Sequence, residues 1–220
     1  MPRSLSLDIQ TVRRALKGTL PGQTAHLRMA PFPREPFTLA KKGPLRRGAV
    51  LILLYPKGEQ LFLPLTKRTS RLKHHQGQIS LPGGAQEPGD SSLWETALRE
   101  AREEIGFALS QVEPLAALSP LVIASSRFEV HPYAAYVPIH PHFRPNPSEV
   151  AELIEFPLER LLLPEGKEKE LWLWQGQQVQ VPFYTYQGWK IWGATAMILS
   201  ELEVLLCQAL ERESPFQERK

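Results

Sequence analysis

The stretch 81–107, which reads LPGGAQEPGDSSLWETALREAREEIGF, constrains the fold more than any other part of the chain. Its apolar residues recur at the i, i+3, i+4 and i+7 spacing of a helix that buries one face. These residues are Trp94, Ala97, Leu98, Ala101 and Ile105. Ser92 with Glu95 is typical of a capping box, and Gly106 is typical of a helix end. The sequence therefore predicts a helix from about residue 91 to residue 105 that packs on a core.

Three carboxylates are predicted on another side of this helix. Glu100, Glu103 and Glu104 fall within an arc of about 100° that is directed away from the apolar stripe. Like charges at this spacing cost roughly a few tenths of a kcal/mol per pair, and a bound cation would reverse the sign. Carboxylate oxygens suit Mg²⁺ or Mn²⁺, which also hold substrate phosphates. Arg99 lies four residues before Glu103, where an ion pair can orient that carboxylate.

The turn before the helix favours a functional site. Pro82, Gly83 and Gly84 let the backbone approach a ligand or a metal more closely than side chains would allow. The alternative for the helix alone is a solvated acidic face that Arg99 and Arg102 staple. A glycine turn placed before an acidic helix is the architecture of a site, and we therefore favour the site.

The rest of the chain predicts alternating strands and helices. The continuous apolar run 49–55 indicates a buried strand, and 61–66 is predicted as its hairpin partner. The other predicted strands lie at 112–123, 129–139, 171–174 and 179–186. The other predicted helices lie at 5–17, from 148, and at 193–211, and the first and last of these are predicted to be amphipathic. Surface connections are predicted at 20–47 and 67–80. This order of elements indicates an α/β or α+β sandwich.

Length and composition indicate one domain with additions. The 220 residues, 42% of them hydrophobic, are enough to bury a core. We expect a helix and a proline-rich basic arm at 1–44, the main domain at 45–211 and a polar tail at 212–220. The single cysteine, Cys207, excludes an internal disulfide and suits a reducing compartment, and a buried thiol is favoured over a nucleophile. The chain shows neither a signal peptide nor a membrane span, so a soluble cytoplasmic protein is expected.

Charge is unevenly distributed along the chain. Residues 1–75 contain 15 Lys and Arg but 3 Asp and Glu. A basic part that meets an acidic part suits a polyanionic ligand bridged by metal, and a solvated charged surface is the alternative. RNA processing is a third interpretation, but the sequence contains no recognisable RNA-binding module, so a nucleic-acid partner is not expected.

The end of the acidic stretch resembles the Nudix box, G-x5-E-x7-R-E-U-x-E-E-x-G-U, in which U is a bulky aliphatic residue. Residues 99–107 match it, except that the small Ala101 stands at a U position. Counted from Gly84, the early acidic position falls on Asp90. Eight residues rather than seven then separate Asp90 from Arg99, and this is where the chain departs from the consensus.

The preceding loop is similar to a second motif, L-L-T-x-R-S/A-x3-R-x3-G-x3-F-P-G-G, of the coenzyme A pyrophosphatase branch of Nudix hydrolases. Residues 64–84 keep every spacing of this motif, including Arg68 and Gly77. The substituted positions are Pro64, Thr69, Lys73 and Leu81. Lys73 keeps the charge of the motif arginine but lacks its bidentate geometry. Segments 143–152 and 191–196 are similar to later parts of the branch.

The resemblance implies a Nudix fold, with a mixed β-sheet sandwiched between helices, and metal-dependent hydrolysis of a pyrophosphate bond. It implies Mg²⁺ or Mn²⁺ as the cofactor, with Glu100 and Glu104 as metal ligands. Glu103 would be a ligand or a metal-linked base, and the Gly84 carbonyl would lie near a metal. Arg99 would assist catalysis beside them.

The general base is left open between Glu103, Glu149 and Glu152, because a Nudix base is not always within the box.

The branch implies coenzyme A as the substrate, with 3′,5′-ADP and 4′-phosphopantetheine as the products. The 3′-phosphate needs a further cation, which Arg68, Arg71 and Lys73 are predicted to supply; a surface charge is the alternative for Arg71. The other residues predicted to bind substrate are Gly77, Pro82 and Gly83.

Two alternatives remain for the function. One is a Nudix hydrolase acting on ADP-ribose or NADH, and the other is a non-catalytic sensor of a nucleotide or of coenzyme A. A small-molecule ligand without a nucleic-acid or membrane partner is expected, and the family is compatible with a homodimer.

Overall fold

The apolar run predicted as a buried strand is the centre of the observed sheet. The computed structural model describes residues 7–32, 44–69, 77–108, 112–174 and 176–212. In strand β1 (Arg46–Lys57), Ile52 faces one hydrophobic cluster and Leu51 and Leu53 face another. Successive side chains of a strand point to opposite faces, so a strand covered on both sides has a continuous apolar sequence.

β1 lies in a mixed eight-stranded sheet with the main order β3-β2-β1-β7-β5. It runs parallel to β7 and antiparallel to β2, and β4, β6 and β8 pair with β1, β7 and β2 respectively. The strands of this sheet are β2 (Gln60–Arg68), β3 (Ile79–Ser80), β4 (Gly83–Ala85), β5 (Glu113–Ala117), β6 (Leu121–Ile123), β7 (Phe128–Tyr136) and β8 (Val150–Pro157).

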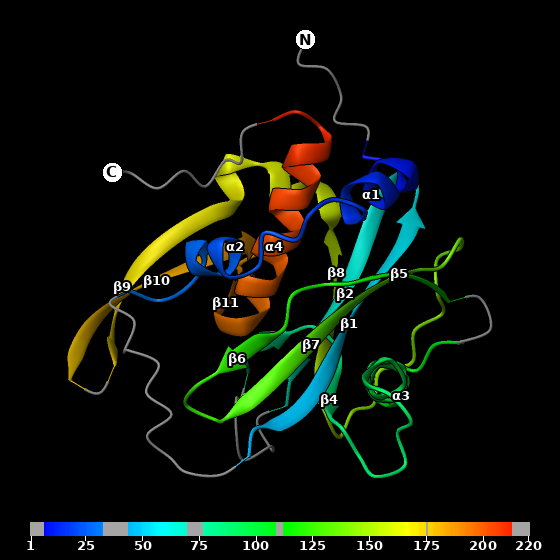
Figure 1. Ribbon diagram of the computed structural model, residues 1–220, viewed down its shortest axis with the longest axis horizontal. Coiled ribbons are helices and arrows are strands. Elements are labelled where there is room, and N and C mark those ends of the chain that lie inside the picture. The colour runs from blue at the N-terminus through cyan, green and yellow to red at the C-terminus, as the bar shows by residue number, and fades with distance from the viewer. Residues whose placement is uncertain (1–6, 33–43, 70–76, 109–111, 175, 213–220) are drawn as a thin grey trace.

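Helices cover both faces of this sheet (Figure 1), which confirms the expected sandwich. Helix α3 (Leu93–Ile105) lies on one face, and α4 (Gly193–Ala209) lies on the other. A second sheet of order β11-β10-β9 adjoins α4. Its strands are β9 (Lys167–Trp174), β10 (Gln177–Tyr186) and β11 (Trp189–Trp192), and two short 3₁₀ helices, η2 (Leu158–Leu162) and η3 (Pro164–Gly166), precede them.

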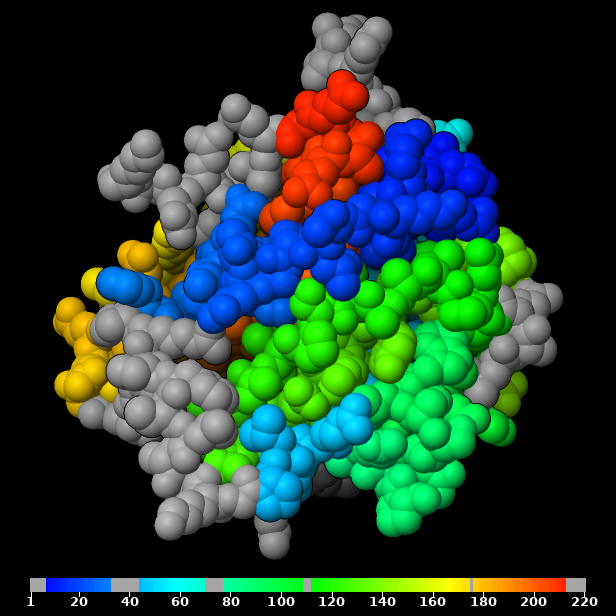
Figure 2. Space-filling model, viewed as in Figure 1, coloured from blue at the N-terminus to red at the C-terminus, as the bar shows by residue number. Residues whose placement is uncertain are grey.

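Two N-terminal helices pack on α4 and form a continuous blue band across one face of the molecule (Figure 2). The predicted helix is observed as α1 (Ile9–Leu16), which Asp8 caps by accepting a hydrogen bond from the Thr11 N–H at 2.7 Å. Helix α2 (Gln23–Arg28) was not predicted, because its segment lacks a long apolar period. Ala25 is nevertheless buried against the core.

Two expectations about helices need correction. The segment predicted to begin a helix at Ser148 forms a turn and then β8, because residues 150–157 pair with β2 across the sheet. Helix α4 was predicted to be amphipathic, yet Ser200, Glu201 and Glu203 are buried along with its apolar residues and Cys207. The interior of the molecule therefore contains carboxylates that the sequence pattern placed outside.

The path between β3 and β4 positions the acidic helix. β1 and β2 pair with each other next to the hairpin that joins them. Away from this hairpin the two strands separate, and there β2 pairs with β3 at Ser80 and β1 pairs with β4 at Gly83. Between Ser80 and Gly83, the chain therefore passes from β3, which pairs with β2, to β4, which pairs with β1. This crossing contains the predicted turn. Helix α3 packs over β1 and β4 beside this crossing.

Among the described residues, no helix combines the length and apolar character that crossing a membrane requires.

Candidate active site

The local signals that predicted α3 act as expected. Ser92 Oγ accepts a hydrogen bond from the Glu95 N–H at 3.2 Å, and Gly106 ends the helix with a left-handed φ of 57°. Ala101 and Ile105 of the predicted apolar stripe are fully buried against the sheet. The helix is thereby fixed against β1 with its glutamates beside the crossing between β3 and β4.

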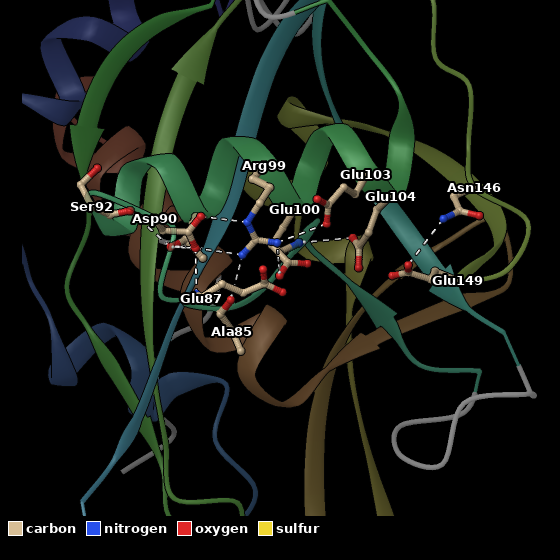
Figure 3. Close-up of polar contacts among 12 residues, drawn as sticks. Ala85, Glu87, Asp90, Ser92, Arg99, Glu100, Glu103, Glu104, Asn146 and Glu149 are labelled. Carbon is tan, nitrogen blue, oxygen red and sulfur yellow. Dashed lines mark hydrogen bonds and ion pairs between the residues drawn. The ribbon is translucent and has the colours of Figure 1, made fainter.

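Arg99 connects the helix to the loop before it (Figure 3). Its Nε and Nη2 each donate to the Asp90 carboxylate at 2.9 Å, and Nη2 also donates to the Ala85 carbonyl at 3.0 Å. Its Nη1 lies 2.9 Å from Glu100 Oε1 and 3.2 Å from Glu103 Oε2. The predicted orientation of Glu103 by Arg99 is observed, and Arg99 holds Glu100 as well.

Asp90 resolves the departure from the consensus spacing. Its carboxylate also accepts from Thr96 Oγ1 at 2.8 Å and from the Glu87 N–H at 2.9 Å. The bidentate contact with Arg99, aided by these donors, holds the pKa of Asp90 well below its usual range. The extra residue is thus accommodated in a closed loop, and the acidic position still meets Arg99.

The three box glutamates differ in exposure. The Glu103 side chain is 53% exposed, that of Glu100 is 16% exposed and that of Glu104 is 3% exposed. The helical pattern places all three away from the apolar stripe, yet Glu104 is buried all the same. The crossing between β3 and β4 covers this carboxylate, and the helical pattern alone does not reveal that cover.

Glu104 is a buried carboxylate with few donors. Its Oε2 accepts from the Gly83 N–H at 3.3 Å, and its Oε1 lies 3.6 Å from Arg68 Nη1. Burial raises the pKa of Glu104 to about 8, although Arg68 and the Gly83 N–H act in the opposite direction. Burial likewise raises the pKa of Glu100. A cation at this position would favour the charged form of both groups.

The two glycines of the turn have different roles. A Cβ added to Gly84 would lie 2.4 Å from the Glu100 carboxyl carbon, so the missing side chain makes room for that carboxylate. A Cβ added to Gly83, which has a φ of 153°, would lie 2.3 Å from the Ala49 carbonyl oxygen. The Gly84 carbonyl oxygen would lie 2.2 Å from a Cβ added to Gly48, and its use as a metal ligand stays a prediction.

The loop with the second motif begins and ends next to these carboxylates. The Arg68 N–H donates to the Gln78 carbonyl at 3.1 Å, and the Gly77 N–H donates to the Arg68 carbonyl at 3.2 Å. The Arg68 side chain extends to Glu104. Pro82 is buried, and its carbonyl accepts from the Leu51 N–H at 2.8 Å.

The predicted substrate cations Arg71 and Lys73 lie outside the described residues, and their roles stay predictions.

Two of the three candidate bases lie on the α3 face of the sheet. Figure 3 shows Glu149 directed towards Glu104, and the negative charge of Glu149 contributes to the raised pKa of both Glu100 and Glu104. Glu152 follows a different course. Its neighbour Leu153 packs in the cluster beneath α3, so Glu152 points to the opposite face of β8. Glu103 and Glu149 therefore remain as candidates.

Asn146 was not singled out from the sequence. It precedes Glu149 by three residues, and its Nδ2 lies 3.5 Å from Glu149 Oε1. The Asn-Pro-Ser sequence at 146–148 is a turn signature and was the available signal.

The donor set suits a hard cation that retains water. Within the described ranges, no three His, Cys, Asp or Glu side chains are arranged as a ready-made metal cage. Mg²⁺ needs one or two carboxylates together with substrate phosphates and water. Glu100 and Glu104 are oxygen donors whose burial disfavours their charged forms, and they fit that requirement. Glu103, which Arg99 holds nearby, is a further oxygen donor.

Comparison with known proteins identifies the family of the chain. The model of the NUDIX domain matches residues 45–177. A protein named "Uncharacterized Nudix hydrolase NudL" from Photorhabdus laumondii subsp. laumondii is 38% identical over 157 residues, which cover 71% of this chain and 83% of the relative. A protein of the same name from Yersinia enterocolitica is 42% identical over 158 residues, which cover 70% of this chain and 78% of the relative.

The fold also has a counterpart among solved structures. The crystal structure of a MutT/nudix family protein from Enterococcus faecalis aligns with a TM-score of 0.50 and 16% identity. The alignment covers 91% of this chain and 78% of that protein. At this identity the likeness concerns the fold alone.

Proposed function

The chain belongs to the NUDIX domain family, and we propose that it hydrolyses the pyrophosphate bond of coenzyme A or a derivative. The family consists of pyrophosphatase-type hydrolases that act on nucleoside diphosphate derivatives and generally use divalent metal ions. The proposed products are 3′,5′-ADP and 4′-phosphopantetheine, so water is added across one P–O–P linkage.

One observation carries the choice of substrate. Arg68 belongs to the motif that resembles the coenzyme A branch, and it lies 3.6 Å from Glu104, which belongs to the box. The loop that would recognise the substrate and the helix that would support the reaction are therefore in contact. In the structure the Arg68 guanidinium faces the Glu104 carboxyl group, and a substrate phosphate would compete for the same guanidinium.

Glu100 and Glu104 are the residues that would hold the cation, with Glu103 close by. A bound divalent cation supplies positive charge for the pyrophosphate and lowers the pKa of the attacking water. Arg99 fixes Glu100 and Glu103 in their positions, so these carboxylates need little rearrangement. Glu103 or Glu149 would take the proton from the attacking water.

The 3′-phosphate of coenzyme A distinguishes it from NADH and ADP-ribose. We propose that the cations of the motif loop bind this phosphate, with Arg68 at the base of the loop and Arg71 and Lys73 beyond it. This phosphate takes no part in the bond that is cleaved, so its contacts with the cations should be equally strong in the ground state and the transition state. Its removal from the substrate should therefore raise KM and change kcat little.

Product analysis with coenzyme A, NADH and ADP-ribose side by side, in Mg²⁺ and in Mn²⁺, tests the proposal. We expect 3′,5′-ADP from coenzyme A and a higher kcat/KM for coenzyme A than for dephospho-coenzyme A. Coenzyme A left intact with both metals would overturn the choice of substrate. The Glu104→Gln variant should lose turnover, whereas Glu95→Gln on the same helix should retain turnover. A non-catalytic sensor would show no turnover even in the parent protein.

A further inference from the structure

The turn at residues 144–150 holds the end of α3. The Arg144 N–H donates to the Ile105 carbonyl and the Asn146 N–H donates to the Glu104 carbonyl, each at 2.8 Å. Gly106 makes this approach possible, because a Cβ there would lie 2.5 Å from the Arg144 carbonyl oxygen. The helix carbonyls that a terminus leaves without intrahelical partners are thus used to fix the turn.

The same turn holds the start of the motif loop. The Thr69 N–H donates to the Glu149 carbonyl at 2.9 Å, and Thr69 Oγ1 donates to the Ser148 carbonyl at 3.3 Å. The next residue, Val150, pairs with Arg68 across β8 and β2. Helix α3 and the start of the motif loop are therefore both held by the turn at residues 144–150, and this turn contains Glu149.

Asn146 uses the two ends of its amide differently. Its Oδ1 accepts from the Ser148 N–H at 3.1 Å and from Ser148 Oγ at 2.7 Å, which stabilises the turn. Its Nδ2 lies 3.5 Å from Glu149 Oε1, which is longer than the usual N–H···O distance of about 2.7–3.2 Å, so this contact is weaker than those of Oδ1. The carbonyl end therefore holds the backbone, and the amino end faces the carboxylate.

We propose that Asn146 is a positioning residue, which directs Glu149 towards Glu100 and Glu104 so that carboxylates from two elements act on one ligand. The inference rests on the proposed function, because it assigns to Glu149 a place in that site. It differs from a structural role in one respect. A structural role needs the Oδ1 of Asn146, whereas the positioning role needs the amino group.

Two variants separate these roles. Asn146→Asp retains an oxygen for the Ser148 donors but replaces the amino donor with a second oxygen facing Glu149. Ser148→Ala removes one donor to Oδ1 and leaves the contact between Asn146 and Glu149. Both keep the backbone hydrogen bonds of the turn. We would measure kcat and KM, the affinity for Mn²⁺ by calorimetry, and thermal unfolding without metal.

The positioning role predicts that Asn146→Asp lowers kcat by about tenfold or more and weakens Mn²⁺ binding similarly, with an unchanged midpoint of unfolding. KM and the unfolding midpoint of Ser148→Ala should stay near those of the parent protein, as should its kcat. Normal kcat and Mn²⁺ affinity in Asn146→Asp would overturn the inference. So would an equal loss of kcat in Ser148→Ala.

A double-mutant cycle gives an independent test. If Asn146 acts through Glu149, then Asn146→Asp should cause no further loss of kcat in a Glu149→Gln background, whereas full additivity would contradict the inference. These measurements use whichever diphosphate substrate is hydrolysed. If coenzyme A is left intact and ADP-ribose is hydrolysed, the proposed substrate is wrong and the cycle still decides the role of Asn146. If none is hydrolysed, Mn²⁺ affinity decides it.

Discussion

Each of the two helices that cover the central sheet, α3 and α4, carries buried carboxylates, but the groups that surround these carboxylates differ. On the α4 face, Glu201 accepts from the Gly22 N–H at 3.0 Å, from the Ser119 N–H at 2.9 Å and from Ser119 Oγ at 2.5 Å. Its neighbour Glu203 accepts from Tyr184 at 2.6 Å and lies 3.4 Å from Lys167 Nζ. Each of these carboxylates has donors of good geometry.

The α3 face is less complete. Glu104 has one hydrogen bond from a backbone N–H at 3.3 Å and an arginine at 3.6 Å, both from the segments that form the candidate site. The electrostatic result is opposite on the two faces. Burial alone would raise the pKa of Glu201, but contacts with His26, Ser119 and Gly22 lower it. Burial raises the pKa of Glu104 to about 8. Buried carboxylates that stabilise the fold are saturated with donors, whereas those of α3 remain available to a cation.

The largest difference should appear in activity when the α3 carboxylate is neutralised. Glu104→Gln should lower kcat by at least about a hundredfold, because a ligand to a catalytic cation supplies several kcal/mol of charge stabilisation. The metal-free variant should be at least as stable as the parent protein, since the Gln side chain cannot ionise whereas burial disfavours ionisation of Glu104. Steady-state kinetics and urea unfolding in EDTA check both parts. Strong destabilisation would place Glu104 with the structural carboxylates instead.

The α4 carboxylate should give the reverse result. Glu201→Ala leaves the N–H groups of Gly22 and Ser119 and the Ser119 hydroxyl without their acceptor, which should cost about 3 kcal/mol or more of unfolding free energy. Activity per folded molecule should be retained at low temperature. Urea unfolding combined with kinetics at that temperature measures both. A stable variant with low kcat would contradict the division between the two faces.

The adjacent glycines of the turn provide a finer test within the α3 face. An added methyl at Gly84 would displace the end of the Glu100 side chain from the position in which Arg99 holds it, so Gly84→Ala should lower kcat by about tenfold with little loss of stability. At Gly83 the methyl meets the backbone of Ala49, so Gly83→Ala should destabilise the protein by about 1–3 kcal/mol. Kinetics and thermal unfolding of the pair distinguish them. Equal effects on both properties would show that the two positions have the same role.

The smallest effect should be opposite pH dependence of metal-free stability. Glu104 has a raised pKa, so its contribution is present below the unfolded pKa of about 4.3 and is lost as the pH rises towards 8. Glu201 has a lowered pKa, so its contribution is present above about 4.3 and is lost as the pH falls through its folded pKa. Urea unfolding in EDTA, from about pH 2 for the Glu201 window up to pH 8 for the Glu104 window, with Glu104→Gln and Glu201→Gln as references, should show slopes of opposite sign in the two windows. Slopes of the same sign would be inconsistent with this assignment.

The parts of the site that follow from local chemistry could be predicted from the sequence. The cap at Ser92, the apolar stripe and the end at Gly106 act over a few residues, so α3 and the contact between Arg99 and Glu103 were correctly expected. Long-range contacts decided the rest. The burial of Glu104 depends on the crossing between β3 and β4. The strand β8 replaces the expected helix because it pairs with β2. The burial of Glu201 likewise depends on partners from other segments.

Measuring Mn²⁺ binding in the absence of substrate tests most directly whether the α3 carboxylates form a cation-binding site. Calorimetric titration of the parent protein, Glu104→Gln and Glu203→Gln, at a temperature where all three are folded, compares the two faces in one experiment. We expect the parent protein and Glu203→Gln to bind Mn²⁺ with similar affinity and Glu104→Gln to bind at least about tenfold more weakly. Equal affinity in the parent protein and Glu104→Gln would contradict the assignment of the α3 face as the metal-dependent site.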